Sequence, residues 1–544
     1  MHTIRIAKPK QRWLFGGVGF HNSEATMTAL MSDHVKNDIA LKTFREISPS
    51  FSRVFAGYAN WTQEAMDAFA DYYDQTFRDA GTLLYLVPGR MPMMMDDFDI
   101  ESYCEQTAQR LEYLIKVRKC TKIRYFCVTN ELSVGNTYAY LAKHLDLLKQ
   151  LHECLYKAFR RHDLDIGLIA TDCSGVENFD QIIWAAANMD EVTDAYCTHL
   201  YLHKFVPGDP AAYDYLTDAF SPMVLQAHKK QKRFLLGEYG FYSSVDRRLT
   251  PMQNDTTYSF YHPEQELDNA IALCEMAMAA INVGSFAAVM WTMLDYPDPF
   301  IRENGDTPAE KARYDAARFS GAGLDYRYNK WGLIRWCDEE QDYSSRAALY
   351  TMGYMAKLFK KGSRVLQCDW DNQENIRACA VTNADGSVSI ALINWGPDLQ
   401  DTCIELEHPL SKPLRVYECG QDHIPYSPFN DLQAPSGVLD AIDGEINITL
   451  NPRSITFLTT DYTDREPSKI RNLRKDGALL RWDPCTDPEH CYYRVFADAD
   501  PRFIPTAENQ IASTIAESVT LERPELCCKV LSVDRWGNIR KEYR

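Results

Sequence analysis

The 544-residue sequence lacks the short motifs that mark several large enzyme classes. No GxGxxG or GxxxxGK[ST] segment follows a predicted strand, so a nucleotide-binding α/β fold loses its main support. The chain has no HExxH and no CxxC pair, and neither of these common zinc-site spacings is therefore present. It also has no GxSxG segment, which would place a nucleophilic serine at a strand–helix turn. We therefore expect neither a metal nor a cofactor.

The chain also lacks an excess of positive charge, a long apolar run and an export signal. Lys plus Arg number 58 and Asp plus Glu number 76, so the formal net charge is −18. Such a chain repels nucleic-acid phosphates and anionic lipid, and no apolar run reaches the roughly 18 residues of a membrane span. The start, MHTIRIAKPK, shows no cleavage pattern. We expect a cytoplasmic protein with no nucleic-acid and no membrane partner.

What the sequence does contain is typical of a folded protein of several domains. Aromatic residues make up 12% of the chain, which is too much apolar surface for a disordered protein. The length corresponds to two to four domains of roughly 150 residues. Sixteen scattered cysteines are interpreted as reduced thiols in the core, because no export signal precedes them.

The first 340 residues alternate short apolar runs with longer segments of helical period. The predicted strands, each almost entirely apolar, are 14–20, 51–57, 82–88, 122–128, 165–171, 194–200, 233–239 and 285–291. The predicted helices are 63–80, 100–119, 138–161, 180–188, 211–232, 263–282 and 344–360. A strand that is apolar on both faces is typical of a parallel sheet covered by helices. Eight such units in series predict an α/β fold, a (β/α)8 TIM barrel over residues 1–361.

The pattern changes after residue 361. Short alternating segments with turn signals predict an antiparallel β-sandwich domain over residues 362–461. Residues 462–544 are predicted to form a small β domain that begins with a polar linker, 461–469. The strand spacing after the linker is typical of a fibronectin type III-like fold. We expect both C-terminal domains to act as structural braces.

Two carboxylates stand at predicted strand ends, where the active site of such a barrel lies. The fourth strand ends in Asn130 and Glu131, and the seventh ends in Glu238. Two carboxylates on opposite walls suit glycosidic bond hydrolysis, one as a proton donor and one as a nucleophile or base. A gap of about 5–5.5 Å gives retention of configuration and one of about 6.5–9.5 Å gives inversion. The sequence alone leaves both outcomes open.

The placement of Asn130-Glu131 and Glu238 resembles clan A, the 4/7 superfamily of retaining glycoside hydrolases with a (β/α)8 barrel. The resemblance covers roughly residues 10–360. It implies that Glu131 is the acid/base and Glu238 the nucleophile. The order of barrel, β-sandwich and fibronectin type III-like tail is similar to glycoside hydrolase family 39, which includes β-xylosidases and α-L-iduronidases.

Further strand ends fit the same resemblance. Arg53 on the second strand would lower the pKa of the nucleophile. His199 and Tyr201 on the sixth would hydrogen-bond the nucleophile or the acid/base, and Trp291 after the eighth would form the floor of the sugar site. Asn130 would hydrogen-bond the sugar 2-hydroxyl.

Other polar residues near the strand ends are less specific. His21 after the first strand is a candidate for binding sugar hydroxyls, and Asp172 after the fifth is equally open between a site and a structural role. A long segment follows the eighth strand, from 292 to 342, and a loop of that length is usually functional. It contains Asp295, Tyr296, Asp298, Arg302, Trp331 and Trp336. The two tryptophans are candidates for lining a subsite, and Arg302 is a candidate for pairing with an acidic sugar.

The sequence therefore predicts a retaining glycoside hydrolase that acts on a small glycoside or oligosaccharide by double displacement. We expect exo action as a β-glycosidase of β-xylosidase-like type, with the pKa of Glu131 raised toward about 6–7 and that of Glu238 normal or lowered. The alternatives are an endo-acting β-glucanase or mannanase and an inactive sugar-binding barrel. A carbohydrate is the expected substrate, and a homo-oligomer remains an open alternative to a monomer.

Overall fold

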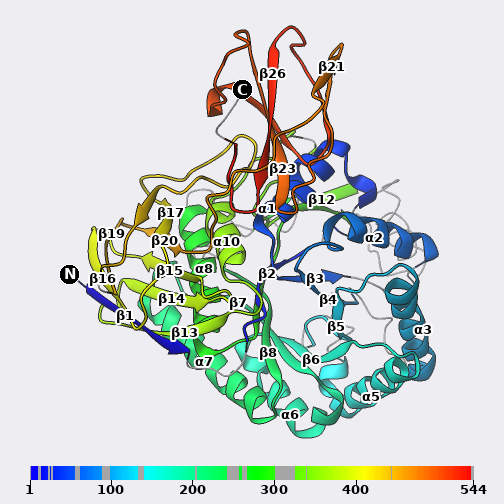
Figure 1. The fold of residues 1–544 in the computed structure, drawn as a ribbon. Helices are drawn as coiled ribbons and strands as arrows, with labels where there is room; N and C mark the ends of the chain where they lie inside the picture. The colour runs from blue at the N-terminus through cyan, green and yellow to red at the C-terminus, as the bar shows by residue number, and fades with distance from the viewer. Residues whose placement is uncertain are drawn as a thin grey trace.

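The computed structural model describes thirteen stretches of the chain. They are residues 2–9, 14–22, 25, 28–55, 62–88, 98–132, 140–202, 205–241, 257–259, 266–300, 325–338, 340–442 and 444–540. A parallel barrel, a nine-stranded sheet and a C-terminal β region make up this part of the chain (Figure 1).

Eight parallel strands close into a barrel, as the sequence predicts. They are β2 (Gly17–His21), β3 (Phe51–Phe55), β4 (Leu83–Val87), β5 (Ile123–Cys127), β6 (Gly167–Ser174), β7 (Ala195–Leu202), β8 (Arg233–Phe241) and β10 (Ala287–Met290). Each pairs with the next in chain order, and β10 closes the ring against β2. Each strand overlaps its predicted segment, because a run buried on both faces is readable from its apolar residues alone.

Helices pack around the barrel (Figure 1). Their bounds are α1 (Leu41–Ile47), α2 (Gln63–Thr76), α3 (Ile100–Glu112), α5 (Leu145–Arg161), α6 (Asp180–Asn188), α7 (Pro210–Lys229), α8 (Glu266–Val283) and α10 (Ala347–Leu358). Several begin at a side-chain cap: Thr62 accepts from the Ala65 N–H and Asp99 from the Ser102 N–H. Such caps satisfy backbone donors that a helix start leaves unpaired.

Apolar side chains fill the barrel interior toward the end where the strands begin, and polar side chains fill it toward the end where the strands finish. Residues from every strand except β2 form this apolar core, including Phe51, Tyr125 and Leu235. The strands approach closely where side chains are smallest. A Cβ at Gly19 would lie 1.6 Å from the carbonyl oxygen of Phe51, so only glycine fits there.

A nine-stranded sheet lies beside the barrel, with the order β18-β17-β20-β15-β14-β13-β1-β16-β19. Its strands are β1 (His2–Pro9), β13 (Arg364–Trp370), β14 (Ile376–Thr382), β15 (Val388–Asn394), β16 (Gln400–Leu406), β17 (Leu414–Gly420), β18 (Gly437–Leu439), β19 (Glu445–Leu450) and β20 (Ser454–Thr459). Apolar residues from both of its ends, such as Ile4, Ile446 and Leu458, share one core, so the sheet curls around them.

The first strand is the main departure from the predicted organisation. The predicted barrel domain, residues 1–361, includes residues 2–9, whereas β1 lies between β13 and β16 in the nine-stranded sheet. The reason is physical: Ile4 and Ile6 alternate with polar residues, as in a strand with one buried face, and both side chains enter the core of that sheet. The domain boundaries at 361/362 and 461/462 stay predictions.

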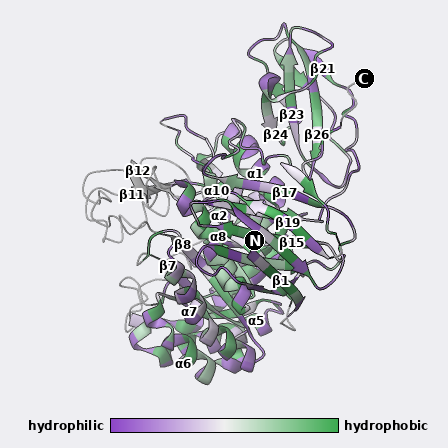
Figure 2. Cartoon of the chain, turned by 90° about the vertical axis from the view of Figure 1, so that its left-hand side faces the viewer, coloured by the Kyte–Doolittle hydropathy of each residue, from purple (hydrophilic) through white to green (hydrophobic). Residues whose placement is uncertain are grey.

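The C-terminal region contains two three-stranded antiparallel sheets that project away from the barrel (Figure 2). One contains β21 (Arg474–Asp476), β22 (Leu479–Arg481) and β25 (Ser518–Thr520), and the other β23 (His490–Asp498), β24 (Gln510–Thr514) and β26 (Cys527–Asp534). Leu480, Trp482, Tyr493 and Val530 connect the two sheets through a shared apolar core. The β-rich character is as predicted, and the fibronectin type III-like detail stays a prediction.

A third small sheet belongs to the segments that follow β8 and β10. It combines β9 (Thr257–Ser259), β11 (Tyr296–Phe300) and β12 (Asp325–Lys330) in the order β11-β12-β9. Part of the predicted long loop therefore forms a pair of antiparallel strands, β11 and β12. Among the described helices, none has both the length and the apolar character needed to cross a membrane.

Candidate active site

Glu131 stands on the turn that follows β5. This turn is held against β6, because the Thr129 hydroxyl donates to the Thr171 carbonyl at 2.8 Å and the Leu132 N–H donates to the Asp172 carbonyl at 3.1 Å. The backbone of Glu131 is left-handed, with φ of 57°. Its side chain is 20% exposed. The carboxylate is therefore fixed by its backbone yet still reaches solvent.

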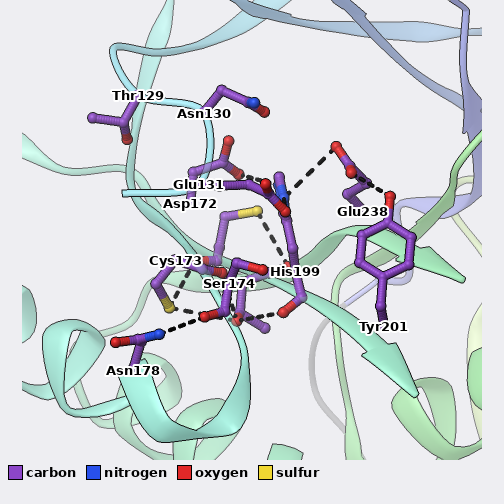
Figure 3. Close-up of polar contacts among 12 residues, drawn as sticks. Thr129, Asn130, Glu131, Asp172, Cys173, Ser174, Asn178, His199, Tyr201 and Glu238 are labelled. Atoms are coloured by element: carbon purple, nitrogen blue, oxygen red, sulfur yellow. Dashed lines mark hydrogen bonds and ion pairs between the residues drawn. The ribbon is translucent and has the colours of Figure 1, made fainter. Parts of the chain in front are cut away.

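Glu238 lies within β8, and it is paired in register with His199 of β7. The preceding residue must be glycine, because a Cβ at Gly237 would lie 2.2 Å from the Cys197 sulfur. Both carboxylate oxygens of Glu238 accept hydrogen bonds. One accepts from the Arg53 guanidinium at 2.7 Å, and the other accepts from the Tyr201 hydroxyl (Figure 3). Two donors from two strands thus hold this carboxylate.

His199 connects the two glutamates. Its Nδ1 lies 3.3 Å from Glu131 and 3.6 Å from Glu238, and its Nε2 lies 2.8 Å from Asp172 (Figure 3). One oxygen of Glu131 and one of Glu238 lie within 4.8 Å of each other. The structure therefore brings together the residues that the sequence predicts at the ends of the fourth, sixth and seventh strands.

Arg53 is fully buried and binds three partners. It donates to Glu238, to Asp172 at 3.0 Å and to the Asn130 side-chain oxygen. In the sheet it lies between His21 and Tyr85. The predicted contact between Arg53 and Glu238 is present, and Asn130 is held at the same point.

Asp172 and Tyr85 complete the polar cluster. Asp172 lies in β6 next to a register shift, has a left-handed φ of 53°, and is completely buried. It accepts hydrogen bonds from His199, Arg53 and, at 2.8 Å, from the Tyr85 hydroxyl. The sequence left Asp172 open and did not single out Tyr85; a lone hydroxyl in the apolar run LLYLV was the only signal.

The charges in this cluster shift the pKa of each member. Burial opposes the charge on His199, but Asp172 and Glu238 raise its pKa to about 10. Burial opposes the charge on Asp172, but His199 and Arg53 lower its pKa well below the usual range. Both residues are therefore ionised at neutral pH, as a buried pair that neutralises itself.

The pKa values of Glu131 and Glu238 shift in directions opposite to those that the sequence predicts for the reaction. Burial raises the pKa of Glu238, and the charges of His199 and Arg53 offset this only in part. Burial also acts to raise the pKa of Glu131, but the hydrogen bond and charge of His199 lower it below its ordinary value. The expectation failed for Glu131 because it omitted the cationic His199 beside it, and for Glu238 because it omitted burial, which outweighs the charges of His199 and Arg53.

An aromatic wall stands beside the carboxylates. Trp291 follows β10, and its ring centroid lies 4.2 Å from that of His21, 5.6 Å from that of Phe55 and 6.2 Å from that of Trp331. Trp331 in turn lies edge-on to Tyr201 at 5.8 Å. His21 has no exposed surface, and this burial favours support of the Trp291 ring over the sugar contact that the sequence predicts.

The other residues singled out in the segment after β10 are either buried or outside the described part of the chain. Trp336 is fully buried and cannot line a subsite as hypothesised. Asp295 is held in a buried pair with Arg346, at 2.8 and 2.7 Å, and is structural. Tyr296 is buried next to Trp291 at 6.1 Å. The side chain of Asp298 and the whole of Arg302 lie outside the described residues.

Two groups of residues in this cluster have the spacing of metal ligands. They are Glu131 with His199 and Glu238, and Asp172 with Cys197 and His199. Both groups need His199, whose Nδ1 and Nε2 lie 3.3 Å from Glu131 and 2.8 Å from Asp172. These are hydrogen-bond distances, and we interpret the cluster as a set of proton donors and acceptors.

Comparison with known proteins gives matches at the level of structure. No family model and no curated protein sequence matches the chain. A glycoside hydrolase family 30 subfamily 8 xylanase from Clostridium acetobutylicum is similar, with 15% identity and a TM-score of 0.52 over 84% of this chain and 98% of the xylanase. The catalytic domain of a GH30 xylanase C from Talaromyces cellulolyticus gives 12% identity and a TM-score of 0.55, over 84% and 99%.

A third similar structure comes from another family. The GH51 α-L-arabinofuranosidase from Thermotoga petrophila has 14% identity and a TM-score of 0.53, covering 85% of this chain and all of the arabinofuranosidase. At such identities the likeness shows the fold: a parallel barrel with an additional β region, as in GH30 and GH51 enzymes. The predicted (β/α)8 barrel agrees with this fold, and the resemblances to clan A and to glycoside hydrolase family 39 stay predictions.

Proposed function

We propose that this protein is a retaining glycoside hydrolase, with Glu131 as the acid/base and Glu238 as the nucleophile. The supporting observation is the spacing of the two carboxylates. One oxygen of each lies within 4.8 Å of the other, whereas inversion requires about 6.5–9.5 Å to admit a water between the carboxyl groups. Similar folds in GH30 and GH51 enzymes are consistent with this chemistry.

The reaction follows from the two positions. Glu238 attacks the anomeric carbon while Glu131 gives its proton to the leaving oxygen, and the glycosidic C–O bond breaks. The resulting glycosyl ester on Glu238 is then opened by water, whose proton returns to Glu131. The donors Arg53 and Tyr201 hold Glu238 for attack, and the greater exposure of Glu131 leaves room for the leaving group and for water.

The acid proton is available through His199. When Glu131, Asp172 and Glu238 are ionised and Arg53 and His199 are both charged, the cluster carries one net negative charge. A proton on His199 Nδ1 is separated from the Glu131 oxygen by a single contact of 3.3 Å. Neutral His199 with protonated Glu131 therefore contains as many protons as cationic His199 with ionised Glu131. We infer that this pair shares the proton that the leaving group receives.

The choice of first substrates follows from the similar structures. By their names, two act as xylanases and one as an α-L-arabinofuranosidase. Exo action of β-xylosidase-like type predicts that 4-nitrophenyl β-D-xyloside is hydrolysed and that xylan is not. The aromatic wall of Trp291, Trp331 and Tyr201 provides faces on which pyranose C–H groups can stack.

The decisive experiment combines an aryl glycoside panel with chemical rescue. We expect Glu131→Ala and Glu238→Ala each to lose hydrolysis by at least about 10³-fold, because each removes a reacting group. Added azide should restore turnover of both, giving a glycosyl azide of retained configuration with Glu131→Ala and of inverted configuration with Glu238→Ala. Glu522→Gln, an exposed carboxylate in the C-terminal region, is the matched control.

Three results would contradict the proposal. Full activity of Glu238→Ala would remove it as the nucleophile, and azide products of the opposite configurations would exchange the two roles. If the wild-type protein binds sugars but cleaves none of a broad panel, the alternative of a sugar-binding barrel is correct. Cleavage of xylan or another polymer, with inactivity on monosaccharide glycosides, would favour the endo-acting alternative.

A further inference from the structure

A cavity opens at the end of the barrel where the strands begin, opposite the candidate active site. Its volume is about 440 Å³, and its wall includes Arg233 at the start of β8, Leu83 at the start of β4 and Phe286 just before β10. Cavities of about 300–1,000 Å³ are of the size that holds small molecules. The proposed active site does not use this cavity, because Glu238 lies toward the other end of β8.

The wall of this cavity is positively charged. Lys232, Arg233 and Lys361 all line it, and none of the described lining residues is a carboxylate. Two of them donate side-chain hydrogen bonds to neutral acceptors: Lys361 Nζ donates to the Gly81 carbonyl at 2.6 Å, and Arg233 donates to the Tyr125 hydroxyl. Among the residues that the structure describes, no carboxylate forms an ion pair with any of these three cations, in a chain whose net charge is −18.

The electrostatic surroundings confirm that the positive charge is not neutralised. Burial, and then the charge of Arg124, lowers the pKa of Arg233. Burial, and then the charge of Lys122, lowers the pKa of Lys361. Nearby Arg124 has its own carboxylate, Asp165 at 2.8 Å. A bound anion would supply the cavity with a compensating negative charge, as the Asp165 carboxylate does for Arg124.

A buried hydroxyl in the same wall lacks a hydrogen bond. Ser285 is 2% exposed, and its Oγ has no hydrogen-bond partner among the residues that the structure describes. Leaving such a group unpaired costs free energy that a ligand acceptor would recover. Ser285 is one of the residues that line the cavity, so a ligand oxygen bound there could accept its proton once the hydroxyl turns toward the cavity.

The rest of the wall is apolar. Phe15, Leu83 and Phe286 line the cavity beside the cations. The Arg233 guanidinium lies over the Phe286 ring, 4.4 Å from its centroid. An inorganic anion would leave this apolar surface uncovered, whereas a ligand with an apolar or aromatic part would bury it.

We propose that this cavity is a binding site for a small organic phosphate ester. The phosphate dianion would be bound by Arg233, Lys232 and Lys361, because several cations around one group favour a doubly charged anion. The Ser285 hydroxyl would donate to a ligand oxygen, and the apolar part would pack against Phe286. The site is independent of the proposed glycosidase reaction and would exist if that proposal failed.

The test uses 2-naphthyl phosphate as the ligand and calorimetric titration of the full chain. Wild-type protein should bind it more tightly than inorganic phosphate and more tightly than 2-naphthol. Arg233→Gln should weaken binding by about tenfold, by loss of a charge-assisted contact, and Ser285→Ala by about three- to tenfold. Lys229→Gln, an exposed lysine on α7 outside the cavity, should not change the affinity.

The variants also separate binding from folding. Ser285→Ala removes a hydroxyl that has no described partner, so its thermal unfolding temperature should not fall while its affinity does. Equal affinity for inorganic phosphate and 2-naphthyl phosphate would overturn the organic-ligand proposal, and equal affinity for 2-naphthol would overturn the phosphate. Absence of binding to wild type, or equal weakening by Lys229→Gln, would overturn the site.

Discussion

At the residue scale, His199 determines how the candidate active site holds its protons. It contacts three carboxylates, and its neighbours raise its pKa to about 10. The same residue lowers the pKa of Glu131, so the two groups cannot be treated as independent acids. This coupling allows the site to hold an acid proton at neutral pH even though the pKa of Glu131 is low.

The shared proton predicts an effect of His199 on the pH profile. In wild type, kcat/KM should fall on the alkaline side only as the pH approaches about 10, where His199 loses its proton. In His199→Gln, Glu131 alone holds the acid proton, so the alkaline limb should move down by at least about two pH units. The measurement is kcat/KM for an aryl glycoside between pH 4 and pH 10. An unchanged alkaline limb in the variant would show that the proton is not shared.

The same pKa shift predicts a pH dependence of stability. The folded pKa of His199 lies above its unfolded value of about 6.5. Its contribution is therefore complete below about pH 6.5 and is lost as the pH rises toward about 10, at no more than about 1.4 kcal/mol per pH unit. Urea unfolding at pH 6.5, 8 and 9.5 should show this decline in wild type and a flatter one in His199→Gln. Parallel declines in both proteins would assign it to other groups.

The site residues differ in how far the sequence could predict them. Glu131, Glu238 and His199 follow apolar runs at points where a barrel strand ends, so their place in the sequence indicates their place in space. Asp172 and Tyr85 join them only through hydrogen bonds across the closed barrel. The pKa directions failed for the same reason, because they depend on distances between residues that are far apart in sequence.

At the element scale, β1 and the barrel strands show why local patterns succeed or fail. Each barrel strand pairs with a neighbour one unit away along the chain, so the repeating pattern of strand and helix predicts the topology. β1 pairs with β13 and β16, which follow it by more than 350 residues. The alternation of Ile4 and Ile6 with polar residues predicts a strand. It does not indicate which sheet that strand joins.

A buried ion pair links α8 to β14. Arg377 Nε binds Glu275 at 2.7 Å, and both side chains are at most 2% exposed. Arg377→Met should lower the free energy of unfolding by about 3–5 kcal/mol, because it leaves a buried carboxylate without a partner. Urea unfolding measures this loss.

Two companion variants test the reason for that loss. The double variant Glu275→Leu with Arg377→Met should recover most of the stability, because no unpaired charge remains. Arg5→Met breaks the exposed pair with Glu405 and should cost no more than about 1 kcal/mol. A double variant as unstable as Arg377→Met alone would contradict the charge explanation.

At the scale of the whole molecule, three parts of the chain meet in one buried charge cluster. Lys42 of α1 binds Glu46 at 3.1 Å and Asp431 at 2.7 Å. From the C-terminal region, Arg494 binds Asp431 at 2.9 Å and the Tyr492 hydroxyl donates to Glu46 at 2.9 Å. Figure 1 shows α1 next to β23, the strand that contains both C-terminal residues. This arrangement supports the expectation that the C-terminal region braces the barrel.

The cluster predicts that the C-terminal region and the barrel unfold together. Deletion of residues 463–544 would remove Arg494 and Tyr492 and expose carboxylates that are now paired, so the remaining protein should unfold at a temperature lower by at least several degrees. Arg494→Met tests the same contact without deletion and should shift it in the same direction. Scanning calorimetry of the full chain should show one transition. Two separate transitions, with the first leaving hydrolytic activity intact, would mean that the C-terminal region is an independent module, because a brace that contributes to barrel stability cannot unfold without weakening it.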